Sequence, residues 1–401
     1  MYEPEAAAIP FGRPASEVDP RDGSARRSPV PRPRIPRRDA AMSPRSVPNA
    51  APYVLLALES SCDDTAAAVL VADGPPGAWT VGDPLPRVAA SVVSAQEEHA
   101  LWGGVVPEIA SRAHQQSVVG VVRRALGEAG VTLGDVSAVA ATRGPGLAGP
   151  LLVGMGFAKG VALATGAAFV GVHHLEGHLA SALLADTPPT YPYLALTVSG
   201  GHTLYVRVDA PGAHTVLGRT RDDAAGEAFD KVGKLLGLGY PGGPEIDRLS
   251  GDGDAAFVRF PRTRLDGFDV SFSGIKTAVR VRLDAAGPAK SDARAAFLDA
   301  HRADLAAAFQ AAVVEMLVGP LVRALEATGL TGVALVGGVS ANRALRGAVA
   351  DACAARGAAL AVPPLRYATD NAAMIGLAAW HRLATHGPDA LSLDVAPSAS
   401  L

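Results

Sequence analysis

The chain has 401 residues, of which 49% are hydrophobic and 19% are charged, and its formal net charge is −3. A chain of this length and composition can form two globular domains. The small net charge excludes a general positive field around the molecule, so any nucleic-acid site must be a local basic patch. The two cysteines, Cys62 and Cys353, lie far apart. They argue against a disulfide framework and fit a reducing cytoplasm, where we expect the protein to be located.

Residues 1–52 are rich in proline and arginine and carry almost no periodic apolar pattern. We expect a disordered extension without the apolar core of a secretory signal. Elsewhere no stretch reaches eighteen apolar residues free of charges and helix breakers. Residues 151–172 come closest, but they contain Lys159 and several glycines. The sequence therefore predicts no membrane span.

The first expected element is a hairpin with a buried strand over 54–58, a polar turn over 59–64 and a returning strand over 65–71. The same pattern returns over 194–208, where the turn is Ser-Gly-Gly-His. This repetition predicts a duplicated domain. Between the two hairpins we expect a helix that opens near Pro107, a strand over 136–142 and a buried strand over 167–172.

The second half continues the alternation of strands and helices. We expect a long helix over 303–325, a strand over 333–336 followed by a helix after Asn342, and a helix over 372–383 capped by Asp370-Asn371. Alternation of this kind predicts an α/β fold that binds ligands at the carboxyl ends of its strands. Pro188-Pro189 marks the boundary between the halves. The expected domains are 53–187 completed by a returning segment 368–386, then 188–367, with a tail over 387–401.

His174 and His178 are the candidate metal ligands. Two residues four apart share a helix face with Cβ atoms about 5–6 Å apart, although such pairs also arise as capping or surface residues. His174 follows a buried strand, at a junction where ligands commonly converge. A distant carboxylate can complete a site with two histidines and one carboxylate, which suits ferrous iron or catalytic zinc. Asp370 is the best candidate.

Other polar residues sit at the expected turns. Ser199, Gly200 and Gly201 have backbone N–H groups that can approach a phosphate closely, but the same triplet is typical of a tight turn. Asp230 and Gly243 suit a nucleotide contact or a plain loop, and Asn342 suits a nucleotide or a helix cap. The first turn contains three acidic candidates for the general base, which are equally explained as solvated turn residues: Glu59, Asp63 and Asp64.

Nine segments in a fixed order carry a family resemblance: ESSCDDT, GGVVPEIASRAH, TRGPGLAGPLLVG, HHLEGHL, VSGGHT, GEAFDKVGKLLGLGYPGGP, VSFSGIKTA, GGVSANRALR and ATDNAAMIG. From about residue 54 to about residue 383 the chain resembles the tRNA adenosine threonylcarbamoyltransferase family of the bacterial TsaD type. The order of the segments is far more specific than any one of them.

The resemblance implies the fold of actin, sugar kinases and Hsp70, with two ribonuclease-H-like domains around a nucleotide cleft. It implies transfer of threonylcarbamoyl from threonylcarbamoyl-adenylate to the N6 amine of adenosine 37, in tRNAs that read codons beginning with adenine. The implied metal, iron or else zinc, falls on His174, His178 and Asp370. The implied adenylate-binding positions are Thr197, Val198, Ser199, Gly200, Gly201, Asp230, Gly243 and Asn342. The implied partners are tRNA, a TsaB-type paralogue, a TsaE-type ATPase and the TsaC-type enzyme that makes the adenylate.

Three rival functions stay open at this point. A metalloprotease is disfavoured because zincins place glutamate directly after the first histidine, where this chain has Leu175. A carbamoyltransferase acting on a small metabolite would use the same metal and adenylate. A nucleotide-gated scaffold of the Hsp70 class would have no use for the metal ligands.

Overall fold

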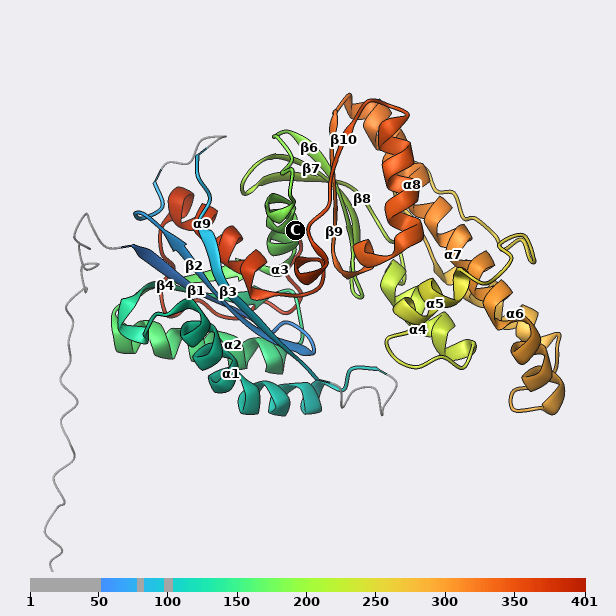
Figure 1. The fold of residues 1–401 in the computed structure, drawn as a ribbon, viewed down its shortest axis with the longest axis horizontal. Helices are drawn as coiled ribbons and strands as arrows, with labels where there is room; N and C mark the ends of the chain where they lie inside the picture. The colour runs from blue at the N-terminus through green and yellow to red at the C-terminus, as the bar shows by residue number, and fades with distance from the viewer. Residues whose placement is uncertain (1–51, 78–82, 97–103) are drawn as a thin grey trace, which may run out of the picture. The chain divides into compact units, whose positions relative to one another are not determined.

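A computed structural model describes residues 52–77, 83–96 and 104–401. The predicted disordered extension, residues 1–52, lies almost entirely outside these residues. The first sheet has the strand order β3-β2-β1-β4-β5 (Figure 1). β1 pairs antiparallel with β2 and parallel with β4, β3 pairs antiparallel with β2, and β5 is parallel to β4. The strand bounds are β1 (Tyr53–Glu59), β2 (Asp64–Ala72), β3 (Arg87–Ala95), β4 (Val136–Gly144) and β5 (Ala168–His173).

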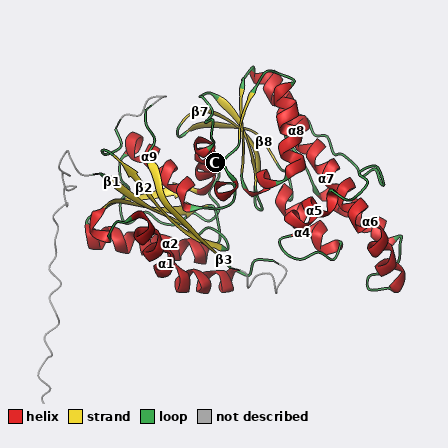
Figure 2. Cartoon of the chain, in the orientation of Figure 1, coloured by secondary structure: helices red, strands yellow, loops and turns green. Residues whose placement is uncertain are grey.

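Helices cover both faces of this sheet (Figure 2). Leu56 and its alternate neighbours in β1 pack toward α1 (Pro107–Ala129) and α2 (Ala148–Thr165). Leu55 points to the opposite face, which α9 (Ala372–His386) covers. This alternation follows from the two-residue repeat of a strand that is buried on both faces. α9 comes late in the chain, yet it packs on the first sheet and brings the preceding residues with it.

The second sheet repeats the first. Its strand order is β10-β9-β6-β7-β8. β7 pairs antiparallel with both β6 and β8, whereas β9 pairs parallel with both β6 and β10. β6 thus takes the place of β1, and the duplication predicted from the two hairpins is confirmed. The strand bounds are β6 (Tyr193–Val198), β7 (Thr203–Ala210), β8 (Ala213–Arg219), β9 (Gly332–Val336) and β10 (Ala359–Ala361).

One apolar core joins the second sheet to its helices. The longest helix, α7, begins eleven residues before the predicted start and contains Pro320. The helix bounds are α3 (His174–Ser181), α4 (Ala225–Leu235), α5 (Gly242–Ser250), α6 (Ser273–Asp284), α7 (Asp292–Thr328) and α8 (Arg343–Ala354). Short 3₁₀ turns span Leu133–Asp135, Ala182–Leu184, Gly338–Ala341 and Leu365–Tyr367.

Among the described residues, α2 and α7 are long and apolar enough to cross a membrane by length and composition alone. This is weak evidence, because a core helix passes the same test. Most of the apolar stretch of α7 is buried in the second core. In α2 a smaller share is buried, because an apolar face of this helix is exposed.

Residues 387–401 cross the first domain beside β4 and β5. The Asp389 carboxylate accepts a hydrogen bond from the N–H of Gly171 at 2.9 Å. Further along, the N–H of Ala396 donates to the carbonyl oxygen of Arg143 at 2.6 Å, and Leu393 packs on the core beneath α2. This segment therefore holds the turn that follows β4.

Gly144 tests the importance of this contact. It has φ +151°, and a Cβ on it would meet the Ala396 carbonyl group. We expect Gly144→Ala to destabilise the protein by about 2–4 kcal/mol, measured by urea unfolding. Gly347→Ala is the matched control, because this exposed position in α8 has no atom within 4 Å of a new Cβ. It should stabilise by about 0.5–1 kcal/mol. Equal effects of the two changes would contradict the assigned role of the Ala396 contact.

Candidate metal centre

The two candidate histidines lie on the short helix α3. β5 ends at His173, whose side chain caps α3 by accepting a hydrogen bond from the N–H of Leu175 at 3.2 Å. α3 begins at His174, and the spacing of four residues brings the rings of His174 and His178 to 4.7 Å between centroids. Both histidines are buried. The predicted common helix face is therefore present.

Asp370 meets this pair from the entrance of α9. Asn371 caps α9 by accepting from the N–H of Met374 at 3.0 Å, and this cap sets the position of the preceding aspartate. Asp370 Oδ1 lies 3.2 Å from Nε2 of His178 and 3.6 Å from Nε2 of His174. Ligand atoms of all three residues lie within 4.8 Å of one another. Residues nearly two hundred positions apart thus converge on one point.

The donor set suits a divalent metal. Nδ1 of His174 faces Glu59 and its Nε2 faces Asp370, so one imidazole lies between two carboxylates. Burial lowers the pKa of His174, but the Asp370 and Glu59 carboxylates outweigh burial and raise it to about 9. A cation at Nε2 would replace this proton. The histidines also hold the pKa of Asp370 well below its usual value, although burial opposes this effect. The Asp370 side chain remains 26% exposed, which leaves one side of the centre open.

The three candidate bases separate into two environments. The side chain of Glu59 is fully buried and contacts His174. Asp63 and Asp64 are only half-buried. Burial first, and then the nearby carboxylates of Asp63, Asp370 and Glu59, together raise the pKa of Asp64 to about 7. Asp64 therefore titrates near neutral pH, where a general base is most effective.

The predicted glycine turn links β6 to β7. Ser199 closes it, because its N–H donates to the carbonyl oxygen of His202 at 2.8 Å and its hydroxyl accepts from the N–H of His202 at 3.1 Å. Gly200 and Gly201 are exposed, and no atom lies within 4 Å of a Cβ built on either. Thr197 and Val198 are buried in β6. The Thr197 hydroxyl has no hydrogen-bond partner among the described residues.

The other predicted nucleotide positions also have structural roles. Asp230 in α4 accepts a hydrogen bond from the N–H of Gly242 at 2.8 Å, and so holds the start of α5, where Gly243 follows. Asn342 caps α8 by accepting from the N–H of Leu345 at 2.8 Å, and its amide donates to Gln310 at 2.6 Å. Asn342 therefore has the capping role that the sequence analysis gave as its alternative. The nucleotide contacts of Asp230, Gly243 and Asn342 stay predictions.

Sequence reasoning missed two supports of the first turn. The Ser61 hydroxyl lies 3.2 Å from Nδ1 of His174. On α1, fully buried His114 bonds through Nδ1 to the Thr65 hydroxyl at 2.7 Å and through Nε2 to the Cys62 carbonyl oxygen at 3.1 Å. A signal existed for His114, because it falls among the buried positions of an otherwise apolar helix stripe.

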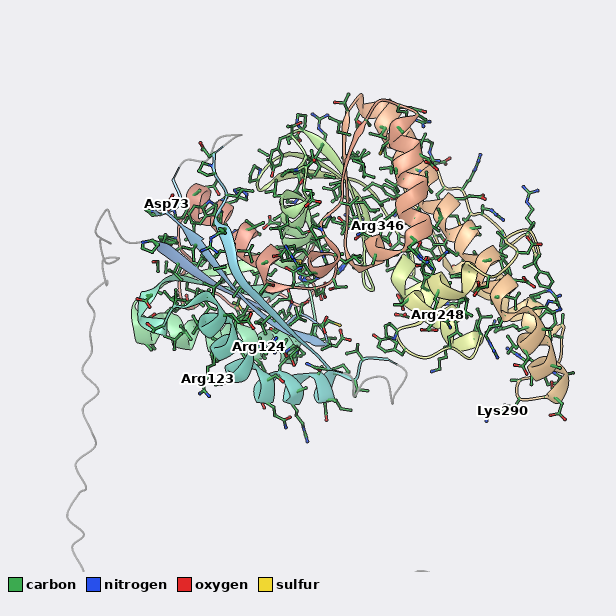
Figure 3. The ribbon with its side chains drawn as sticks, in the orientation of Figure 1. Asp73, Arg123, Arg124, Arg248, Lys290 and Arg346 are labelled. Atoms are coloured by element: carbon green, nitrogen blue, oxygen red, sulfur yellow. The ribbon has the colours of Figure 1, made fainter. Side chains whose placement is uncertain are left out.

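The raised pKa of Asp64 predicts a pH-dependent cost in stability. The unfolded chain loses this proton near pH 4 and the folded protein near pH 7, so the cost grows over that interval and is then constant. We expect Asp64→Asn to stabilise the metal-free protein by about 2–4 kcal/mol at pH 8 and by little at pH 4. Unfolding by urea across this pH range measures the difference. Asp73→Asn, an exposed change just after β2 (Figure 3), should stay within about 0.5 kcal/mol. A gain from Asp64→Asn that does not vary with pH would contradict the shift.

Comparison with known proteins gives the family. Residues 87–377 match the family model TsaD, tRNA N6-adenosine threonylcarbamoyltransferase. The protein of that name from Salinibacter ruber is 51% identical over 350 residues, which is 87% of this chain and 100% of the relative. Its namesake from Syntrophotalea carbinolica is 49% identical over 81% of this chain and 90% of its own length.

The solved structure of full-length HypF in its phosphate- and nucleotide-bound form has a TM-score of 0.51 at 12% identity. The match covers 86% of this chain and 48% of HypF. At this identity the likeness speaks for the fold alone, and it agrees with the predicted two-domain fold of the actin, sugar-kinase and Hsp70 type. Because its sequence matches the family over most of the chain, the protein belongs to the tRNA N6-adenosine threonylcarbamoyltransferase family.

Proposed function

We propose that this chain transfers a threonylcarbamoyl group from threonylcarbamoyl-adenylate to the N6 amine of adenosine 37 in tRNA. The substrates are tRNAs that read codons beginning with adenine. The observation that carries the proposal is the convergence of His174, His178 and Asp370 in a chain that belongs to this family. None of the relatives named above favours a protease or a small-molecule carbamoyltransferase.

The chemistry requires alignment of two substrates and removal of one proton. The N6 nitrogen forms a bond to the carbamoyl carbon, the bond from that carbon to the phosphate oxygen breaks, and adenylate leaves as an anion. The open N–H groups at Gly200 and Gly201 bind the phosphate. Asp64 takes the proton from the amine, because a carboxylate with a pKa of about 7 can accept a proton at neutral pH. When bound at the three ligands, a divalent ion, with ferrous iron preferred and zinc the alternative, supplies polarisation and orientation of the threonylcarbamoyl group.

Lys231, Arg343 and Arg112 are candidates for contacts with tRNA phosphates, and they differ in availability. Lys231 forms ion pairs with Asp223 and Glu227, and Arg343 forms one with Asp247. Arg112 is exposed on α1, as Arg123 and Arg124 are further along the same helix (Figure 3). Since ion-paired side chains already have their counterions, Arg112 is the better candidate for a phosphate contact.

A transfer assay tests the proposed function. With threonylcarbamoyl-adenylate and unmodified tRNA, we expect the wild-type protein to add the threonylcarbamoyl mass to tRNA and a chelator to stop the addition. His174→Ala should lower the rate at least about 100-fold and leave adenylate binding largely intact, because the phosphate contacts lie in the turn between β6 and β7. Mass analysis of the tRNA gives the rate. His386→Ala, on the last turn of α9, is the control and should keep the wild-type rate. Undiminished transfer by metal-free His174→Ala would refute the metal role.

The proposed TsaB-type paralogue has a suitable surface on the first domain. Leu152 and Leu163 on α2 are 55% and 70% exposed, and Val119 on α1 is 49% exposed. Between the two leucines, Gly156 and Gly160 have no atom within 4 Å of a built Cβ. An apolar helix face interrupted by small residues allows a second helix to approach closely. We propose that the paralogue packs its own helices here, while the TsaE-type ATPase has no assigned surface.

Introducing negative charge on the exposed face of α2 tests the proposed surface for the paralogue. The double change Leu152→Glu/Leu163→Glu should weaken association with the paralogue at least about 10-fold, because each buried carboxylate would lack a partner. Sedimentation of the mixed proteins measures the association. Val281→Glu is the control, because this residue on α6 is equally exposed, at 60%, but lies in the second domain. Association that survives the double change would exclude this face.

A further inference from the structure

Glu59 occupies a place that a general base cannot use. It is the last residue of β1, and its side chain is fully buried. Its Oε2 accepts a hydrogen bond from the Thr142 hydroxyl at 2.7 Å and lies 3.0 Å from Nδ1 of His174. Its Oε1 accepts from the N–H of Ser61 at 2.5 Å. Both oxygens are therefore engaged by groups of the fold, and a base must reach the proton that it removes.

The same contacts define the orientation of His174. A neutral imidazole carries one N–H, and the nitrogen without a proton is the one that can bind a metal. A carboxylate at Nδ1 keeps the proton on Nδ1. Nε2, which lies 3.6 Å from Asp370 Oδ1, is then the nitrogen whose proton a metal ion would replace. Thr142, buried on the neighbouring strand β4, donates to the same oxygen of this carboxylate, Oε2.

We propose that Glu59 is a positioning residue that selects the Nδ1–H tautomer of His174 and so presents Nε2 to the metal. Carboxylates that hold a ligating histidine in this way raise the basicity of the ligand as well as orient it. The first polar turn is thereby divided in function. Glu59 and Ser61 support the metal ligand, and Asp63 and Asp64 remain for substrate. This inference rests on the proposed metal centre.

Glu59→Gln is the sharpest test. The substitution keeps the shape but replaces one oxygen by an NH₂ group, which then faces either the Ser61 N–H or the donors of Thr142 and His174. We expect the affinity for Zn(II), measured by competition with a chromophoric chelator, to fall about 10- to 100-fold. Binding of AMP should change less than about 2-fold. Thr142→Val is the matched control, because it removes one hydrogen bond to the same carboxylate but keeps the carboxylate beside His174. Its loss of Zn(II) affinity should be smaller.

The outcomes separate the two proposals. If the wild-type protein does not bind Zn(II), the proposed metal centre is refuted. If the wild type binds and Glu59→Gln binds within about 2-fold of it, the positioning role is overturned, and a loss of transfer in that variant would return Glu59 to the role of a base.

A measurement on the unchanged protein covers the case in which Glu59→Gln does not fold. Nitrogen NMR of the histidines in the Zn(II)-loaded wild type should show His174 protonated at Nδ1 and ligated at Nε2. The opposite assignment would overturn the proposal.

Discussion

A buried imidazole held between two carboxylates is the contact on which this site depends. Glu59 arrives from the end of β1, Asp370 from the entrance of α9, and His174 from the first turn of α3. Each carboxylate would be costly to bury alone, and a protonated or metal-bound imidazole between them offsets that cost. The late return of α9 to the first sheet is therefore a requirement of the site, because it brings Asp370 to the histidines.

Duplication explains how one protein has two equivalent hairpin turns with different side chains, one acidic and one rich in glycine. β1 and β6 occupy equivalent places in two sheets of the same order, and each runs into the tip of a hairpin. In the first copy the tip carries carboxylates and is supported from α1 by His114. In the second copy it carries Gly200 and Gly201 and is open. Side-chain size and charge thus give two turns of the same backbone design different chemical properties.

Local patterns predicted seven of the described strands, the helix that pairs His174 with His178, and the capped start of α9, because each depends on residues close in sequence. They did not predict β3, β8 or β10. They did not predict that α7 would begin at Asp292, or that residues 387–401 would hold the turn after β4. The start of α7 has a local cause, because the Ser291 hydroxyl caps the helix by accepting from the N–H of Arg294 at 3.3 Å. The contact of residues 387–401 depends on packing between distant segments, which residue spacing does not encode. The exposed apolar face of α2 was likewise missed, since composition alone does not distinguish an exposed leucine such as Leu163 from a buried one.

The sequence by itself determined the duplicated α/β fold, the family and the identity of the candidate ligands, because hydrophobic period, turn residues and an ordered set of motifs are written locally. Only the tertiary structure decided what each acidic residue of the first turn contacts. Glu59, Asp63 and Asp64 are equivalent as carboxylates in the sequence. In the fold, Glu59 is enclosed by donors, whereas burial and the neighbouring carboxylates raise the pKa of Asp64. Burial and neighbouring charge, which arise from segments far apart in the chain, separate these roles.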